Sequence, residues 1–371
     1  MNKALIALTA AFALHNTTAH SVIFNSNTVI GVGDPTYDGQ PIVVSNCTLT
    51  VNGPHRFASL LLTNSAVLTH SPAPNGETNN RVDLTIAGDV GIPTDCSMDV
   101  SGRGYASASG PGVGCSNGSE SGGGGGHGGV EGVSAKGCPG GGAYDSFLTP
   151  TLPGSGGGNG YATSGGFAGG IIQLTVGGTL RVDGALTAQG ANPTSGGYGG
   201  GGAGGSITLV VDTLAGTGTI SANGGNGSNP GGGGGGGRIA VELTTLESPP
   251  MTTAFGGNGN QRGGAGTVLV RPIRSQIANL DVGNGDTFGA VTPLSIAGGV
   301  QSLVIRNGAI VVPGDALVVT NLSVGSNGVL TCLSGQAGLF ATAVNALNIE
   351  VGGRVTADGR GWLQSLDPQH S

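Results

Sequence analysis

Residues 207–227 read ITLVVDTLAGTGTISANGGNG, and residues 239–259 repeat the pattern as IAVELTTLESPPMTTAFGGNG, 32 positions later. In both copies apolar residues stand two apart, and both copies end in Gly-Gly-Asn-Gly. Side chains two apart share one face of a strand, so the spacing predicts strands with a buried face. Glycine at the end of each copy predicts a tight corner.

The same pattern extends on both sides of this pair. An earlier unit covers residues 172–188, and a shortened later unit begins at Val268, which makes about four related coils. A single coil has too few strands to bury its apolar face, whereas stacked coils join their Ile, Leu and Val residues into a continuous core. The repeats therefore predict an all-β solenoid.

A longer repeat divides the chain into two modules. Residues 60–70 (LLLTNSAVLTH) match residues 322–332 (LSVGSNGVLTC) at an offset of 262. From this match we expect a second copy that begins near Pro272 and is cut short at Ser371. We expect a signal peptide at residues 1–19, a first solenoid module at 20–271 and a second, truncated module at 272–371.

The first module contains a glycine-rich insertion at about residues 102–170. It has several prolines and few apolar anchors, a composition that fits a disordered segment. The same composition also fits extended left-handed polyglycine arcs that pack where side chains would clash. Both interpretations remain open from the sequence.

Composition and targeting signals restrict the function. The chain has 79 glycines, 9% charged residues and a net charge of −7, with its 13 basic residues scattered, so nucleic-acid binding is not expected. Lys3, the apolar residues 4–14 and small residues before Ala19 predict a secretory signal peptide cleaved near Ala19. No later segment is apolar enough for a spanning helix. We expect a secreted or cell-surface protein.

Five cysteines remain after cleavage, and export permits disulfides. Cys115 and Cys138 flank one glycine-rich segment, where a cross-link would restrict the loop. These two residues are the candidate disulfide pair. Because the number of cysteines is odd, at least one cysteine is left without a disulfide partner.

The alternating Ile/Val/Leu coils, the Ala-x-Gly-Gly-x-Gly corners and the long glycine clusters resemble the glycine-rich repeat regions of large bacterial surface proteins, which are adhesin-like and more broadly pectin-lyase-like. The resemblance covers roughly residues 43–362. It implies a right-handed parallel β-helix (β-solenoid) with long glycine-rich arcs, exported and associated with the surface.

Enzymes of this architecture use clustered carboxylates with Arg or Lys. The candidates here are Asp183 and Asp212, which Arg181 and Arg238 would approach if the coils stack in register. The favoured interpretation is structural, because Asp183-Gly184 reads as a turn and Asp at a strand end bonds local amides. No cofactor is expected. Calcium is a lesser alternative, because the turns carry Asn where calcium-binding repeats carry Asp.

The first functional hypothesis is a non-enzymatic structural or adhesin-like protein, whose stiff solenoid is a spacer or a multivalent contact surface. Its partners would be surface polysaccharide or other copies of itself. The alternative is a polysaccharide-active enzyme or a carbohydrate-binding module, which would require several carboxylates and Arg or aromatic residues in one groove.

Overall fold

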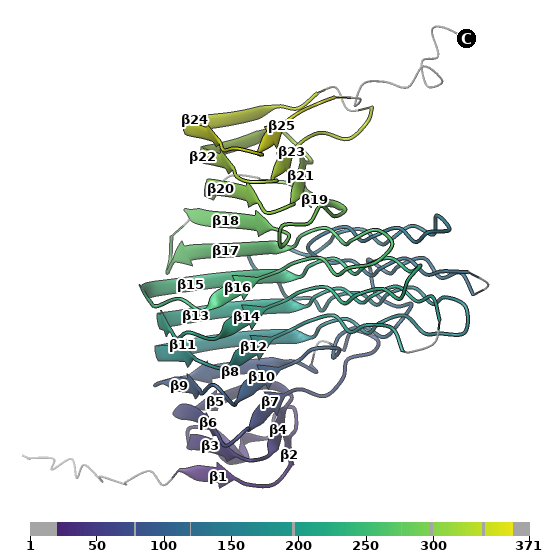
Figure 1. Cartoon of the computed structure of the whole chain (residues 1–371). Helices are drawn as coiled ribbons and strands as arrows, with labels where there is room; N and C mark the ends of the chain where they lie inside the picture. The colour runs from purple at the N-terminus through teal and green to yellow at the C-terminus, as the bar shows by residue number, and fades with distance from the viewer. Residues whose placement is uncertain are drawn as a thin grey trace, which may run out of the picture.

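The computed structural model describes residues 21–358, except 78, 119, 195–196, 276, 297–299 and 336–337. The predicted signal peptide lies outside the described residues. Strands stack one above another along the molecule, and glycine-rich arcs project from one side of the stack (Figure 1). Apart from one short 3-10 helix, η1 (Pro35–Tyr37), the regular structure of the described residues is β.

The described strands form a 14-stranded, a 7-stranded and a 4-stranded sheet, here called the long sheet, the first short sheet and the second short sheet. The strands of the long sheet are β1 (Val22–Phe24), β3 (Pro41–Ser45), β5 (Gly53–Phe57), β6 (Ser59–Thr63), β8 (Val82–Ile86), β9 (Val90–Ile92), β11 (Ile171–Val182), β13 (Ser206–Ala215), β15 (Arg238–Glu247), β17 (Thr267–Pro272), β18 (Ala278–Gly283), β20 (Val300–Arg306), β22 (Leu317–Val324) and β24 (Ala341–Ile349).

The two short sheets contain the remaining strands. The first consists of β2 (Thr28–Ile30), β4 (Thr48–Val51), β7 (Val67–Thr69), β10 (Ser97–Asp99), β12 (Ala185–Thr187), β14 (Thr219–Ser221) and β16 (Met251–Thr253). The second consists of β19 (Val291–Leu294), β21 (Ile310–Pro313), β23 (Val329–Leu330) and β25 (Arg354–Val355).

The sequence repeats pair with one another in register. Ile207 of β13 lies opposite Ile239 of β15, and Val268 of β17 follows in the same column. The strands that follow in the same coils, β12, β14 and β16, pair in the same order in the first short sheet and are parallel. The all-β class and the parallel pairing predicted from the sequence are confirmed.

The first core lies between the long sheet and the first short sheet. Ile207, Leu209 and Val211 of β13 are fully buried there, together with Ile220 of β14. Because these residues alternate along the strand, their neighbours point to the other face of the long sheet. One coil thus contributes two thin apolar rows, and the stack turns them into a column.

The core changes face at the junction of the two modules. Ile239 and Val241 belong to the first core, but Ala240 between them belongs to a second core, with Leu269 and Leu280. Strands β17 and β18 are antiparallel, so the strand direction in the long sheet also reverses here. A reversal of strand direction combined with a change of face leaves the sense of winding unchanged. The hairpin follows Pro272, where the sequence repeat restarts.

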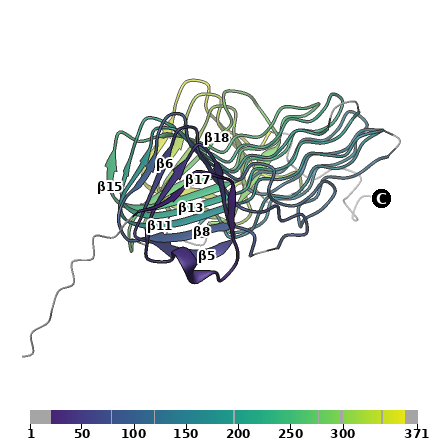
Figure 2. The same ribbon diagram turned by 90° about the horizontal axis from the view of Figure 1, so that it is seen from below.

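Glycine arcs form a wing beside the first core (Figure 2). We call this the glycine wing; it comprises residues 122–129, 154–158, 165–170, 199–205, 231–237 and 256–266. Its arcs bond through their backbones: Gly125 N donates to Gly201 O at 2.8 Å, and Gly201 N donates to Gly232 O at 3.0 Å. Of the two interpretations of the insertion, packed arcs describe the structure. Glycine is required because neighbouring carbonyls occupy the space of a side chain.

Asparagines at the corners join one coil to the next. The side-chain oxygen of Asn223 accepts from the N–H of Phe255, 32 residues on, at 2.7 Å. Asn226 accepts in the same way from the N–H of Asn258 at 2.8 Å. Asn223 and Asn226, at the corner of one coil, therefore satisfy backbone donors of the next coil that the sheet ladders do not reach.

We expect Asn223→Ala to reduce the free energy of unfolding by about 1 kcal/mol, because it leaves a half-buried amide without its acceptor. Urea denaturation measures the loss. Asn279→Ala is the matched control, since Asn279 is an exposed strand residue. Equal stability of the two variants would contradict a structural role for the corner asparagines.

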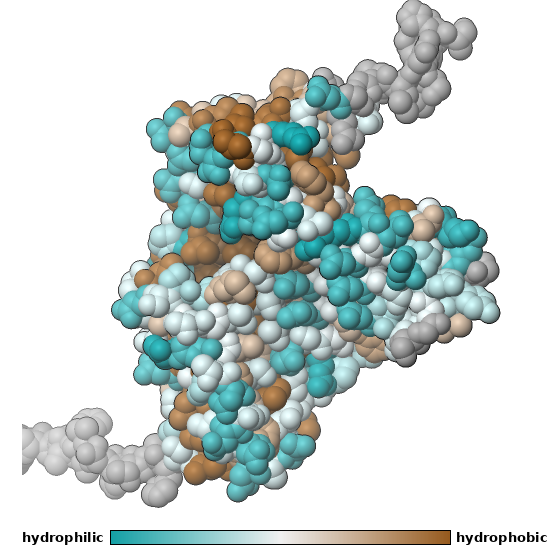
Figure 3. Space-filling view, viewed as in Figure 1, coloured by the Kyte–Doolittle hydropathy of each residue, from teal (hydrophilic) through white to brown (hydrophobic). Residues whose placement is uncertain are grey.

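Apolar side chains gather at the end of the stack formed by β22 and β24 (Figure 3). Phe340 is 64% exposed, Val344 72% and Leu347 58%. Among the described residues β24 is the last strand of the long sheet, so one of its edges pairs with no strand. In the part of the chain that the structure describes, no helix is long and apolar enough to cross a membrane.

Candidate functional site

A strap of ten residues, 143–152, crosses the outer face of the long sheet. Ser206 donates its hydroxyl to Leu152 O at 2.6 Å, and Thr208 donates to Pro150 O at 3.0 Å. Phe147 of the strap packs against the second core. The strap therefore lies over the outward residues of β13 and β15, next to the module junction.

Arg238, the first residue of β15, is buried beneath the strap. Its side chain donates from Nε to Tyr144 O at 2.9 Å and from Nη1 to Thr267 Oγ1 at 3.3 Å. Arg238 is only 5% exposed. Burial lowers the pKa of its guanidinium to about 10, against the opposing effects of Asp145 and Tyr144. Arg238 is therefore still a cation at neutral pH, with no carboxylate among the described residues at ion-pair distance.

Asp145 is the nearest anionic group of this site, and its side chain is 6% exposed. Its carboxylate accepts from the backbone N–H groups of Ser146 at 2.8 Å and of Thr151 and Leu152, both at 2.9 Å. Burial alone would raise the pKa of Asp145, but the interaction with His127 and the backbone hydrogen bonds produce a net lowering. These amides hold Asp145 as an anion.

His127 belongs to the glycine wing and is fully buried where the wing meets the strap. Its Nδ1 lies 2.9 Å from Gly204 O, and its Nε2 lies 3.4 Å from a carboxylate oxygen of Asp145. Burial lowers the pKa of His127, with Arg238 acting in the same direction and Asp145 in the opposite one. Because a carbonyl oxygen can only accept, Nδ1 carries a proton and donates to Gly204 O.

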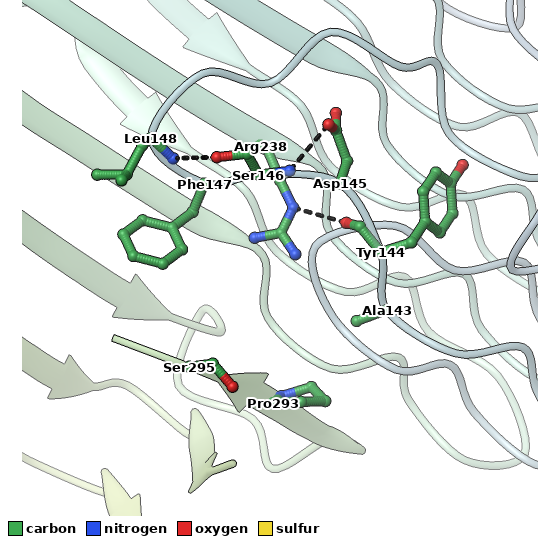
Figure 4. Close-up of a pocket in the computed structure, with 9 residues that line it drawn as sticks. All are labelled: Ala143, Tyr144, Asp145, Ser146, Phe147, Leu148, Arg238, Pro293 and Ser295. Atoms are coloured by element: carbon green, nitrogen blue, oxygen red, sulfur yellow. Dashed lines mark hydrogen bonds between the residues drawn. The ribbon is translucent and has the colours of Figure 1, made fainter. Parts of the chain in front are cut away.

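A cavity of about 360 Å³ opens beside these groups. Figure 4 shows the strap on one side, with β15 and β19 supplying the other walls. Its lining consists of residues 143–148, Arg238, Pro293 and Ser295. The cavity thus combines a buried cation, an anion held by amides, two serine hydroxyls and apolar surface from Phe147, Leu148 and Pro293.

Glu131 is a second buried acid, and it packs against Gly124 and Gly126 of the glycine wing. It is 1% exposed, and neither carboxylate oxygen has a hydrogen-bond partner among the described residues. Burial raises its pKa well above the ordinary value. A carboxyl in such surroundings is neutral at pH values where an exposed glutamate is charged.

The structure separates the carboxylates considered from the sequence. Arg181 and Asp183 pair with each other, Nε to Oδ2, at 2.6 Å on the surface of the coil. Asp183 also accepts from the N–H of Thr217 in the next coil at 3.1 Å. Asp183 is therefore a turn residue that joins two neighbouring coils.

Asp212 lies elsewhere, on the outward face of β13. Arg238 pairs with Ser206, which is six residues before Asp212 and therefore roughly 20 Å from it at the rise of a strand. The expectation that Arg238 approaches these carboxylates is wrong, because the register places it at the opposite end of the strand. Arg238 instead lines the cavity under the strap.

Cys115 and Cys138, the pair considered from the sequence, are joined by a disulfide with a Cα–Cα distance of 5.6 Å. The bond ties the segment before the arc 122–129 to the turn that follows this arc. The other three cysteines, Cys47, Cys96 and Cys332, are buried free thiols.

Within the residues that the structure describes, no group of three or more His, Cys, Asp or Glu side chains is arranged to hold a metal ion. Two of the corner asparagines, Asn223 and Asn226, instead accept backbone N–H groups of the next coil. Asn258 accepts from the side chain of Arg262.

Sequence reasoning missed the group formed by His127, Asp145 and Arg238. Two of its members lie in the insertion that had no repeat to align. One signal was present: β15 begins with a charged residue, Arg238, where β13 has Ser206 and β17 has Thr267. A charge at a repeat position otherwise occupied by a small hydroxyl residue marks a local departure from the stacking pattern.

Comparison with known proteins gives no assignment. No family model matches the chain, and no curated protein and no solved structure matches it.

Proposed function

We propose that this protein is a non-enzymatic structural protein, exported and held outside the cell, in which a stiff β-solenoid is a spacer or a multivalent contact surface. The observation that supports this proposal is the continuity of the long sheet. Its 14 described strands run through both modules, and the core changes face without interrupting the ladder at β17 and β18.

The glycine wing adds stiffness to the first module. Each arc is hydrogen-bonded to arcs from other coils, so bending the stack would break backbone bonds in the wing as well as in the sheets. The amount of buried glycine backbone is costly in chain entropy. Such a cost suits a protein whose role depends on shape.

We further infer that the coils wind in the right-handed sense. Strand β11 connects to the parallel strand β13 of the same sheet through β12 and a glycine arc. Crossover connections between parallel strands of one sheet are right-handed in about 98% of cases. The second module would share this sense, because strand direction and core face reverse together.

The proposed contacts are surface polysaccharide or other copies of the same chain. Among the described residues one edge of β24 pairs with no strand, and this supports the second partner, because an exposed apolar edge strand is a template for pairing. Residues 341–349 therefore form the surface at which we expect one copy to meet another.

Sedimentation velocity and small-angle scattering of the chain from residue 20 onward test the proposal. We expect an elongated particle that associates as its concentration rises, and Val344→Lys should reduce the association. Release of reducing ends or unsaturated products from acidic polysaccharides would contradict the non-enzymatic role. A compact particle would contradict the spacer.

Export is tested separately by sequencing the N-terminus of the protein recovered from outside the producing cell. We expect it to begin at His20. Retention of the uncleaved chain inside the cell would contradict the proposed location.

A further inference from the structure

We propose that the cavity under the strap binds a small organic anion with a single carboxylate, which pairs with Arg238. This site is independent of the spacer function, since a stiff solenoid requires no ligand. It is also separate from Asp183 and Asp212, because the register of β13 and β15 places those carboxylates toward the other end of the strands.

The charge balance of the cavity favours an anion. A buried guanidinium is costly unless a partner is close, and Arg238 is more than nine-tenths buried with only neutral oxygens as hydrogen-bond partners. Asp145 compensates from a distance, but its oxygens already accept three backbone amides and contact His127. An incoming carboxylate would supply the contact ion pair that Arg238 lacks.

The geometry leaves one side of Arg238 open. Its Nε and Nη1 are held by Tyr144 and Thr267, and these bonds fix the plane of the guanidinium. Figure 4 shows the terminal nitrogens directed into the space bounded by Phe147, Ser295 and Pro293. A carboxylate there would accept from the guanidinium, and the hydroxyl of Ser295, on the wall facing Arg238, is a further donor.

Size and charge limit the occupant. A cavity of about 360 Å³ is at the small end of ligand sites and suits a molecule with one ring. Phe147 and Pro293 offer apolar surface for the body of the ligand. Asp145, an anion of the strap that also lines the cavity, would repel a second negative charge, so a monocarboxylate is favoured over sulfate or phosphate.

Glucuronate is a suitable probe, with glucose as the neutral molecule of the same ring size and sulfate as the inorganic anion. All three are titrated into the full chain at constant ionic strength, and binding is followed by calorimetry and by the melting temperature. We expect glucuronate to bind at least tenfold more tightly than either control. Equal binding of glucuronate and glucose would overturn the role of the carboxylate, and equal binding of glucuronate and sulfate would overturn the assignment to an organic anion.

Ser295→Glu tests the location without removing the buried arginine. It places a carboxylate on the wall facing Arg238, so the melting temperature should be kept or raised while the affinity for glucuronate falls at least tenfold. Ser26→Glu makes the same change in charge at an exposed position between β1 and β2, which Figure 1 shows several strands away from β15 and β19, and it should bind glucuronate like the unaltered chain. Unchanged affinity in Ser295→Glu, or an equal loss in both variants, would overturn the site.

Discussion

Gly201→Ala is expected to lower the free energy of unfolding by about 3 kcal/mol, near the upper end of the usual cost of overpacking. Gly201 lies at the centre of the glycine wing and is bonded through its backbone to Gly125 and Gly232. A Cβ added to it would lie 2.0 Å from Gly225 O, well inside the contact distance of the two atoms. Because the obstacle is backbone from another coil, the methyl group can be accommodated only by separating the arcs.

The control is Gly142→Ala in the same glycine-rich part of the chain. A Cβ at Gly142 would meet no atom within 4 Å. Alanine there should be neutral or stabilising by up to about 1 kcal/mol, since it restricts the unfolded chain. Urea denaturation of both variants separates the two cases. Similar stability of the two would show that the wing does not contribute to folding as described.

Stability should fall as the pH is lowered from about 6.5 to 4, and His70 should account for roughly 3 kcal/mol of the loss. His70 is buried at the end of β7, where Nδ1 donates to Ser71 O at 2.6 Å and Nε2 accepts from the N–H of Ile171 at 3.2 Å. It joins the first short sheet to the start of β11. Burial lowers its pKa from 6.5 to about 4, Arg103 acts in the same direction, and the bond to Ser71 opposes both.

The sign follows from proton binding. Between pH 4 and 6.5 the unfolded chain binds a proton at His70 and the folded chain does not, so acid favours unfolding. The stabilisation is complete above pH 6.5 and is lost as the pH falls toward the folded pKa. His127 has the same sign, because its pKa is also lowered. Glu131 has the opposite sign: its raised pKa gives stability that is present below pH 4.5 and lost as the pH rises.

Urea denaturation of the unaltered chain and of His70→Gln from pH 4 to 7 isolates the contribution of His70 to the pH dependence of stability. Glutamine retains an acceptor for the N–H of Ile171 but does not titrate, and both chains keep His127 and Glu131. The free energy of unfolding of the unaltered chain, relative to that of His70→Gln, should therefore fall by roughly 3 kcal/mol from pH 7 to pH 4. Parallel curves would rule out the assignment to His70.

These predictions concern the parts of the molecule that give it shape. The glycine wing and the His70 contact both join coils that are far apart in the sequence, as the bond between residues 70 and 171 illustrates. A protein used as a spacer would depend on them more than on any one side chain at its surface. The cavity at Arg238 would then be a separate property, placed where the two modules meet.

The sequence by itself determined the coils, the direction of their pairing and the corners. The 32-residue offset between Ile207 and Ile239 became the register of β13 and β15, because equivalent residues of a repeat must share one core. The spacing of Cys115 and Cys138 identified the disulfide in the same local way. Both inferences use residues whose neighbours are fixed by the repeat or by a short loop.

Only the tertiary structure decided the packing of the arcs, the change of core face and the cavity. Polyglycine carries no side-chain pattern, so nothing in residues 231–237 indicates which carbonyls they contact. The change of core face at β17 depends on which face of the long sheet Leu269 lies on. Side chains alternate between the two faces along a strand, so the sequence pattern is compatible with either face. Arg238, His127 and Asp145 meet because the strap crosses the sheet, and no local rule of sequence sets that path.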